Sequence, residues 1–225
     1  MFELFIKREN RILDILQKFI DQELAFIVVG GYAVSSYKHR FSVDADIIIR
    51  INDKEKFEEV LRNNKFIKTV VKDLDHVYAP EFIRYETQDK LPVSVDLLIN
   101  GIGSRNTNAS FSFEQLEKYS KKRKIIGIEK EITCLIPDKE ILIALKIHSG
   151  RLTDMRDIMA LSKDIDADVI ERFLWIGNTS IVKENIKKIL TLINDKGFID
   201  SFKGVFIEKK YDISLKDIEK LKKLI

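Results

Sequence analysis

The chain has 225 residues, of which 45% are hydrophobic and 33% are charged, and its formal net charge is +3. A chain of this length can bury one good core, or a core and a smaller helical lobe. No stretch approaches the roughly 18 to 20 apolar residues that a membrane-spanning helix needs, so we expect no membrane partner. The amphipathic N-terminus carries acidic residues, unlike a signal peptide, which predicts a cytoplasmic protein.

Cysteine and histidine are too sparse for a disulfide or a zinc site. The one cysteine, Cys134, lies in an apolar run, and we interpret it as a core thiol rather than a nucleophile. The three histidines, His39, His76 and His148, are dispersed along the chain. One cysteine and three scattered histidines do not supply a zinc ligand set.

Strand patterns dominate the first part of the chain and helix patterns the last part. We expect helices at about 2–21, 31–38, 53–64 and 113–120, and strands at about 24–29, 42–50, 66–72, 81–86, 92–99 and as a pair within 123–135. From Pro137 onward we expect helices at about 138–149, 153–164, 166–175, 179–195 and 214–224. The change of pattern at 136–137 has no flexible linker, which predicts two closely packed halves.

A glycine pair follows the first strand. The apolar run Leu24 to Val29 ends in Gly30 and Gly31, and a segment that can form a helix comes next. Such a turn brings bare backbone N–H groups close to an anion, and the helix N-terminus favours negative charge there. The alternative is a tight turn that needs only a positive φ.

Three aspartates lie inside strand patterns that are otherwise apolar. Asp44 and Asp46 alternate with apolar residues in the run 43–49, so both carboxylates leave the same face of the strand. Two like charges in a half-apolar setting need a cation or a proton, and Mg²⁺ prefers such oxygen ligands. Asp96 is the lone carboxylate of the strand 92–99 and predicts a third metal ligand or a general base. The alternative for the acid pair is the solvated face of an edge strand.

The order of these features resembles the nucleotidyltransferase superfamily that includes DNA polymerase β. Its pattern is a Gly-Gly or Gly-Ser turn, an Asp-x-Asp strand and a lone Asp on a later strand. The segment 40–43, Arg-Phe-Ser-Val, is similar to small stand-alone prokaryotic members such as the AbiEii-like toxins and the minimal nucleotidyltransferases of toxin–antitoxin operons. The segment 146–157 looks like the Lys-x4-Arg-x2-Asp-x2-Asp stretch of such proteins. The resemblance covers roughly residues 24–160.

The resemblance implies an α/β (α+β) fold, with a mixed-sheet nucleotidyltransferase domain in residues 1–136 and a helical C-terminal lobe in residues 137–225. It implies a transferase that moves NMP from an NTP such as ATP to an acceptor and releases pyrophosphate, with Mg²⁺ or Mn²⁺ as cofactor. The implied catalytic and metal-binding residues are Asp44, Asp46 and Asp96. The implied nucleotide-binding residues are Gly30, Gly31, Ser35, Arg40, Ser42, Lys146, Arg151 and Asp154.

Two positions depart from the family pattern. Many members carry a serine directly after the first glycine, where this chain has Gly31 and offers Ser35 or Ser36 one turn later. Phosphate binding would then rely on backbone amides, Arg40 and Lys146. Small members often have a lysine where this chain has Thr153.

The segment 138–157 also has a local interpretation. We expect Asp138 to cap a helix that ends at Gly150, and Thr153 to cap the next one. Asp154 and Asp157 are three residues apart and share a helix face, where they could orient Arg151 or Lys146 toward a triphosphate. The alternative is a solvated helix face with ordinary ion pairs.

The acceptor is not predicted by the sequence. RNA, protein and small molecules, antibiotics included, all remain open, as do the oligomeric state and the alternative of a non-catalytic nucleotide-binding or toxin–antitoxin partner protein. The polar loop 100–108 is either a mobile rim of the site or an ordinary connection. Basic residues form a run and enrich the tail, which indicates either a solvated surface or a docking surface for a polyanion such as tRNA. They are Lys118, Lys121, Lys122, Arg123 and Lys124, then Lys209, Lys210, Lys216, Lys220, Lys222 and Lys223.

Overall fold

The computed structural model describes residues 2–74, 76–204, 206 and 213–225, and the chain divides into two compact units. The first unit comprises Met1–Ser36, Phe41–Gly103 and Ser110–Pro137, and the second comprises Tyr37–Arg40, Ser104–Ala109 and Asp138–Ile225. Two short segments from the first half of the sequence, 37–40 and 104–109, therefore belong to the second unit.

A seven-stranded mixed sheet forms the centre of the first unit, with the strand order β3-β4-β5-β2-β1-β9-β8. The pairs β2–β5 and β1–β9 are parallel, and the other neighbours are antiparallel. This arrangement confirms the predicted α/β class with a mixed sheet. The strands are β1 (Phe26–Val29), β2 (Asp44–Ile49), β3 (Phe66–Asp73), β4 (Glu81–Thr87), β5 (Ser94–Ile99), β8 (Ser120–Ile126) and β9 (Glu131–Pro137).

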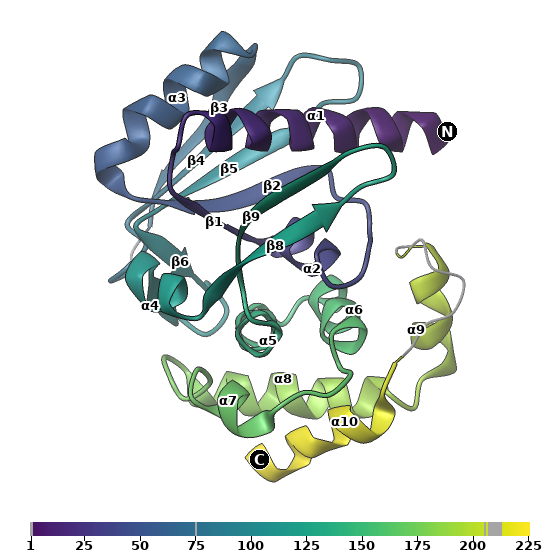
Figure 1. The fold of residues 1–225 in the computed structure, drawn as a ribbon. Coiled ribbons are helices and arrows are strands. Elements are labelled where there is room, and N and C mark those ends of the chain that lie inside the picture. The colour runs from purple at the N-terminus through teal and green to yellow at the C-terminus, as the bar shows by residue number, and fades with distance from the viewer. Residues whose placement is uncertain (1, 75, 205, 207–212) are drawn as a thin grey trace. The chain divides into compact units, whose positions relative to one another are not determined.

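Helices cover this sheet through apolar faces. The helices of the unit are α1 (Phe2–Asp21), α2 (Gly30–Ser35), α3 (Lys54–Asn63) and α4 (Phe113–Lys118), with a 3₁₀ turn at Ile51–Asp53. In α1, Ile12, Leu16 and Phe19 are fully buried at helical spacing. The ring centroids of Phe19 and of Phe57 on α3 lie 4.8 Å apart, so the two helices pack against each other through these rings. Figure 1 shows α1 and α3 on one side of the sheet and α2 on the other.

The prediction of a loop over the whole of residues 100–108 is wrong, because part of this segment forms a strand. Residues Gly101–Gly103 form β6, which pairs with β7 (Ser110–Ser112), and the intervening residues 104–109 belong to the second unit. Glycine is required at 101 because a Cβ there would lie 2.2 Å from the carbonyl oxygen of Phe111. The predicted helix 31–38 is also shorter than expected, since α2 ends at Ser35.

The second unit is helical and is organised around α5 (Lys139–Ser149). Ile141, Ile143, Ala144 and Ile147 of α5 are fully buried, so the helix is apolar on most of its surface, as expected for a central helix. The other helices are α6 (Leu152–Ala160), α7 (Ala167–Glu171), α8 (Thr179–Leu192), α9 (Lys196–Asp200) and α10 (Leu215–Glu219), with 3₁₀ turns at Ser201–Gly204 and Lys220–Leu224. The sequence did not predict α9.

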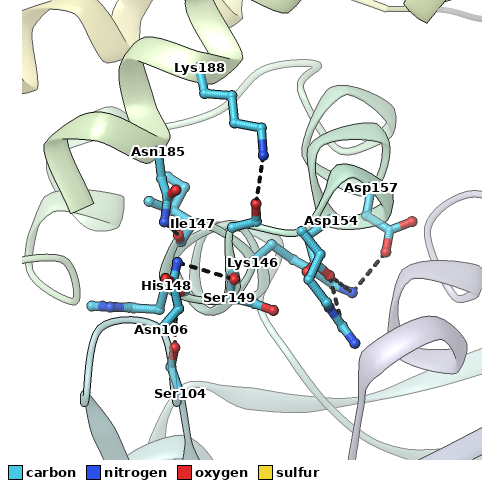
Figure 2. Close-up of polar contacts among 12 residues, drawn as sticks. Ser104, Asn106, Lys146, Ile147, His148, Ser149, Asp154, Asp157, Asn185 and Lys188 are labelled. Atoms are coloured by element: carbon cyan, nitrogen blue, oxygen red, sulfur yellow. Dashed lines mark hydrogen bonds and ion pairs between the residues drawn. The ribbon is translucent and has the colours of Figure 1, made fainter. Parts of the chain in front are cut away.

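Side chains satisfy the carbonyl groups at the end of α5 (Figure 2). Ser104 Oγ donates to the His148 carbonyl at 2.8 Å, and Asn185 Nδ2 donates to the Ile147 carbonyl at 2.8 Å. Gly150 takes the predicted stop position with φ of +68°. Because Ser104 comes from the segment 104–109, its bond holds that segment against α5, and the Asn185 bond holds α8 against the same helix end.

The predicted caps are partly wrong. Asp138 occupies the N-cap position of α5, but its side chain makes no capping hydrogen bond. Thr153 does not cap α6, because that helix begins at Leu152 and Arg151 is its N-cap residue. The Arg151 side chain is instead drawn to Asp154, one turn along.

Cys134 lies in β9 with 5% of its surface exposed, and burial raises the pKa of its thiol to about 12. These properties fit the predicted core thiol. Among the residues that the structure describes, no helix combines the length and apolar character needed to cross a membrane.

Candidate active site

The strand β2 presents Asp44 and Asp46 on one face. Both are half-buried, whereas Ala45 between them is fully buried on the opposite face. This alternation follows from the pleat of a strand. The predicted acid pair therefore shares a face of a central strand rather than an edge strand, since β2 has β5 on one side and β1 on the other.

The parallel register of β2 and β5 adds the third carboxylate. Asp46 pairs directly with Asp96, and Asp44 pairs with Ser94. Residues paired across adjacent strands lie about 5 Å apart at the backbone and send their side chains to the same face. Asp96 is 2% exposed. The three aspartates predicted as one site are thus brought together by the sheet.

Gly30 packs against the carboxylate of Asp46. Its φ is +63°, and a Cβ at this position would lie 1.9 Å from Asp46 Oδ2. Only glycine meets both conditions, because a side chain would be strained at this φ and would displace the carboxylate. The glycine turn is therefore built around the acid pair, a dependence that the sequence interpretation did not contain.

Ser42 and Ser35 lie in different surroundings. The hydroxyl of Ser42 donates to Asp44 Oδ1 at 2.8 Å, so it orients the first carboxylate. The Tyr32 hydroxyl in turn donates to the Ser42 carbonyl at 3.1 Å. Ser35, at the last position of α2, is 5% exposed, and Gly31 is buried beside it in the same helix. A nucleotide contact by any of these residues stays a prediction.

Arg84 is a residue of this face that sequence reasoning missed. It lies on β4 directly opposite Asp96, and its Nε and Nη2 donate to the two carboxylate oxygens at 2.8 and 2.7 Å. The pKa of Asp96 is raised because burial outweighs the stabilising guanidinium. The signal in the sequence was the short turn between the strands 81–86 and 92–99, which fixes the register that pairs Arg84 with Asp96.

The donor chemistry of this face can be tested against a divalent cation. Asp44 and Asp46 supply hard oxygen ligands, and Mg²⁺ is typically held by one or two carboxylates with substrate phosphates. No cluster of three histidine, cysteine or acidic side chains is arranged to hold a metal ion within the described part of the chain. Both oxygens of Asp96 accept hydrogen bonds from Arg84. The oxygens of Asp44 and Asp46 suit the ion by their chemistry, whereas those of Asp96 are engaged by Arg84.

A second charged cluster lies within the helical unit (Figure 2). Lys146 on α5 is 7% exposed, and its Nζ lies 2.9 Å from Asp154 Oδ1 and 2.8 Å from Asp157 Oδ2 on α6. Burial lowers the pKa of Lys146, but the Asp157 and Asp154 carboxylates outweigh burial and leave it raised. The acid pair thus contacts Lys146, and the predicted orientation of Lys146 toward a triphosphate stays a prediction.

The arginines of the helical unit extend the cluster. Arg151 Nε donates to Asp154 Oδ2 at 2.7 Å from a side chain that is 70% exposed. Arg40, in the segment 37–40 of this unit, places Nε 3.4 Å from Asp157 Oδ1. Burial raises the pKa of Asp154, yet Lys146 and Arg151 lower it to about 2. Nucleotide binding by Arg40, Lys146, Arg151 and Asp154 stays a prediction.

The basic run 118–124 spans the end of α4 and the edge strand β8. Lys121, Lys122 and Lys124 are exposed there, and Lys124 Nζ lies 2.5 Å from Glu131 Oε1 of β9. Exposed lysines suit both a protected sheet edge and a polyanion surface, so the two interpretations remain open. Lys209 and Lys210 of the basic tail lie outside the described residues.

Comparisons with known proteins find relatives only by structure. No family model and no curated protein matches the sequence. The lincosamide antibiotic adenylyltransferase LnuA, solved with bound lincomycin, aligns at 18% identity over 70% of this chain and 98% of that chain, with a TM-score of 0.48. The antibiotic-resistance factor ANT(2'')-Ia aligns at 13% identity over 91% of this chain and 98% of that chain, with a TM-score of 0.44.

A proposed nucleotidyltransferase from H. pylori aligns at 17% identity over 99% of this chain and 98% of that chain, with a TM-score of 0.49. The chain is thus similar in structure to solved nucleotidyltransferases. At these identities and TM-scores, the likeness assigns neither a reaction nor a substrate to it.

Proposed function

We propose that the protein is a metal-dependent nucleotidyltransferase that transfers NMP from an NTP to an acceptor. The observation that supports it most is the gathering of Asp44, Asp46 and Asp96 on one sheet face, with Gly30 packed against Asp46. Three clustered carboxylates cost free energy through repulsion and desolvation, so a purely structural role for them is hard to justify. A role in holding the metal ions that neutralise charge at a phosphoryl group accounts for such a cluster better.

Asp44 and Asp46 are the residues that would hold Mg²⁺. Their shared face presents oxygens on the same side of β2, and Ser42 fixes one carboxylate of the pair. When bound, the ion would lower the pKa of the attacking group and neutralise charge on the leaving pyrophosphate. The turn at Gly30 keeps Asp46 in place, since no side chain intervenes between the turn and the carboxylate.

Asp96 would accept the proton of the acceptor. In the transfer, the acceptor oxygen forms a bond to the α-phosphorus, and the bond from that phosphorus to the bridging oxygen breaks. The electron pair leaves with pyrophosphate, and the acceptor proton passes to Asp96. Burial raises the pKa of Asp96, which makes it a stronger base than an exposed aspartate.

The remaining assignments belong to the same proposal. Backbone amides at Gly30 and Gly31 would bind phosphate oxygens, and Lys146 and Arg151 would contribute positive charge. The nucleotide would be ATP or another NTP, and the acceptor would be RNA, a protein or a small molecule. A cytoplasmic location and a place in a toxin–antitoxin pair remain predictions.

Labelled ATP tests the reaction type. The protein is incubated with cell lysate and ATP labelled either at the α- or at the γ-phosphorus, and the label is followed into RNA, protein and small molecules. We expect only the α-label to be transferred. A transferred γ-label would mean a phosphotransferase, and no transfer with any of the four NTPs would mean a binding protein.

The variant Asp46→Asn tests the site. It removes one carboxylate charge while keeping the shape of the side chain, and we expect transfer to fall about a thousandfold or more. Asp14→Asn is the matched control, because Asp14 forms an exposed ion pair with Lys130 on the same unit. Full activity in Asp46→Asn, with a circular dichroism spectrum like that of the wild type, contradicts the assignment.

A further inference from the structure

The pair formed by Arg84 and Asp96 joins the predicted site to β4. Arg84 uses Nε and Nη2 in parallel, at 2.8 and 2.7 Å, and so engages both oxygens of the carboxylate. Bidentate pairs of this kind are among the strongest hydrogen-bonded ion pairs in proteins. Cross-strand pairing places the two residues opposite each other, so the contact is fixed by the sheet register.

The two partners differ in exposure. The Asp96 side chain is 3% exposed, whereas the Arg84 side chain is 34% exposed. Asp96 sits on a central strand among buried neighbours and cannot turn toward solvent. Arg84 has a long side chain with one side open to water, and so it is the partner that can move.

Arg84 and a divalent cation compete for the same carboxylate. A cation bound to Asp96 would take oxygen lone pairs that now accept hydrogen bonds, and it would lie within a few ångströms of a guanidinium charge. Both effects disfavour simultaneous occupancy. The hydrogen-bonded carboxylate of Asp96 raises the pKa of the Arg84 guanidinium most, and the charge of Asp44 adds to this attraction.

We propose that Arg84 is a positioning residue that holds Asp96 and excludes a divalent cation from it, so that Asp96 becomes a metal ligand or a base only when Arg84 is released. This inference rests on the proposed function for the role of Asp96. It adds an order of events: the pair Asp44 and Asp46 binds a cation first, and Asp96 joins after Arg84 has moved. Phosphate oxygens are suitable partners for the released guanidinium.

Direct Mn²⁺ binding tests the competition without any turnover. The whole chain is titrated with Mn²⁺ in the absence of nucleotide, with electron paramagnetic resonance measuring the free ion. We expect Arg84→Gln to bind Mn²⁺ about tenfold more tightly than the wild type, because the Asp96 carboxylate then needs a cation in place of the arginine. Adding Asp96→Asn to Arg84→Gln should remove that gain.

A matched control uses another ion pair of β4, formed with a lysine of α3. Lys54 forms an ion pair with Glu81 of β4 at 2.7 Å, with side-chain exposures of 24% and 19%. Lys54→Gln therefore breaks a comparable ion pair away from the aspartates, and its Mn²⁺ affinity should equal that of the wild type. Arg84→Lys keeps the charge without the bidentate geometry and should bind Mn²⁺ with intermediate affinity.

Thermal unfolding separates this role from a structural one. Arg84→Gln should lower Tm without metal, and saturating Mn²⁺ should restore more of Tm in this variant than it adds to the wild type. A purely structural Arg84 would lower Tm and leave the Mn²⁺ affinity unchanged. Equal affinity in wild type, Arg84→Gln and Arg84→Lys, including no binding at all, overturns the inference. Failure of the proposed function shows differently, as absence of label transfer from every NTP.

Discussion

Two charged clusters of this protein both pair aspartates with basic side chains, and they differ in which charges are buried. On the sheet face, the carboxylate of Asp96 is buried and its cation, Arg84, is one-third exposed. In the helical unit, the cation Lys146 is buried together with both of its carboxylates, Asp154 and Asp157. The first arrangement can exchange its cation for another, whereas the second cannot lose Lys146 without removing the buried cation that Asp154 and Asp157 share.

The comparison shows that charge pairing alone does not identify a binding site. Lys146 and Arg84 both belong to strong ion pairs, yet only Arg84 has access to solvent through which a partner could replace it. Arg151, which is 70% exposed, is the corresponding exchangeable cation of the helical cluster. We therefore expect Arg151 to respond to added anions more readily than Lys146.

Removing the buried cation of the helical cluster should have the largest effect on stability. Lys146→Met keeps the length of the side chain and leaves Asp154 and Asp157 without their common partner. We expect the free energy of unfolding to fall by about 3 to 5 kcal/mol. Urea unfolding measures it, and Lys187→Met, an exposed lysine of α8, should change stability by less than about 0.5 kcal/mol. A similar small change in Lys146→Met would mean that the cluster is not a structural unit.

The sheet face depends on steric fit, which Gly30→Ala should disturb. Alanine at φ of +63° is strained, and its Cβ would meet Asp46 Oδ2 at 1.9 Å. We expect a loss of about 2 to 3 kcal/mol in stability together with weaker Mn²⁺ binding, since Asp46 must move. Gly197→Ala in α9, where the nearest atom lies at 3.2 Å, should instead be neutral or slightly stabilising. Unchanged Mn²⁺ binding in Gly30→Ala would contradict the inference that the turn at Gly30 holds Asp46 in position.

Acid sensitivity should come from the helical cluster. The pKa of Asp154 is about 2 in the folded protein against 3.8 for the ordinary value, so the unfolded chain binds its proton first. The resulting stabilisation is fully present above pH 3.8 and is lost as pH falls through about 2. It amounts to about 2 kcal/mol. Urea unfolding at a series of pH values between 5 and 2 measures this loss, and Lys146→Met should remove most of it. Equal acid slopes in both proteins would contradict the assigned cause.

The sequence was sufficient where a property depends on local periodicity. Apolar alternation located the strands, and the same alternation placed Asp44 and Asp46 on one face. Asp96 could be assigned to the same site because it is the single carboxylate in the centre of another apolar strand. The three-residue spacing of Asp154 and Asp157 placed them on one helix face near Arg151 or Lys146, but their burial with Lys146 could not be predicted from it.

The sequence was insufficient where a property depends on contacts between distant elements. Arg84 was missed because its role depends on the register of β4 against β5, not on its neighbours in the chain. The fit of Gly30 against Asp46 depends on the antiparallel pairing of β1 with β2. The association of 104–109 with the helical unit depends on hydrogen bonds to the end of α5, which no local pattern announces.

The buried state of Cys134 makes the protein well suited to site-specific labelling. It is the one cysteine of the chain, and with its pKa raised to about 12 it will remain a thiol that maleimides and nitroxide reagents barely attack at neutral pH. A cysteine introduced at the exposed Thr69 of β3, next to Arg84 on β4, would therefore take a nitroxide without prior removal of the native thiol. Broadening of that label by Mn²⁺ would then report occupancy of the aspartate face in the otherwise natural protein.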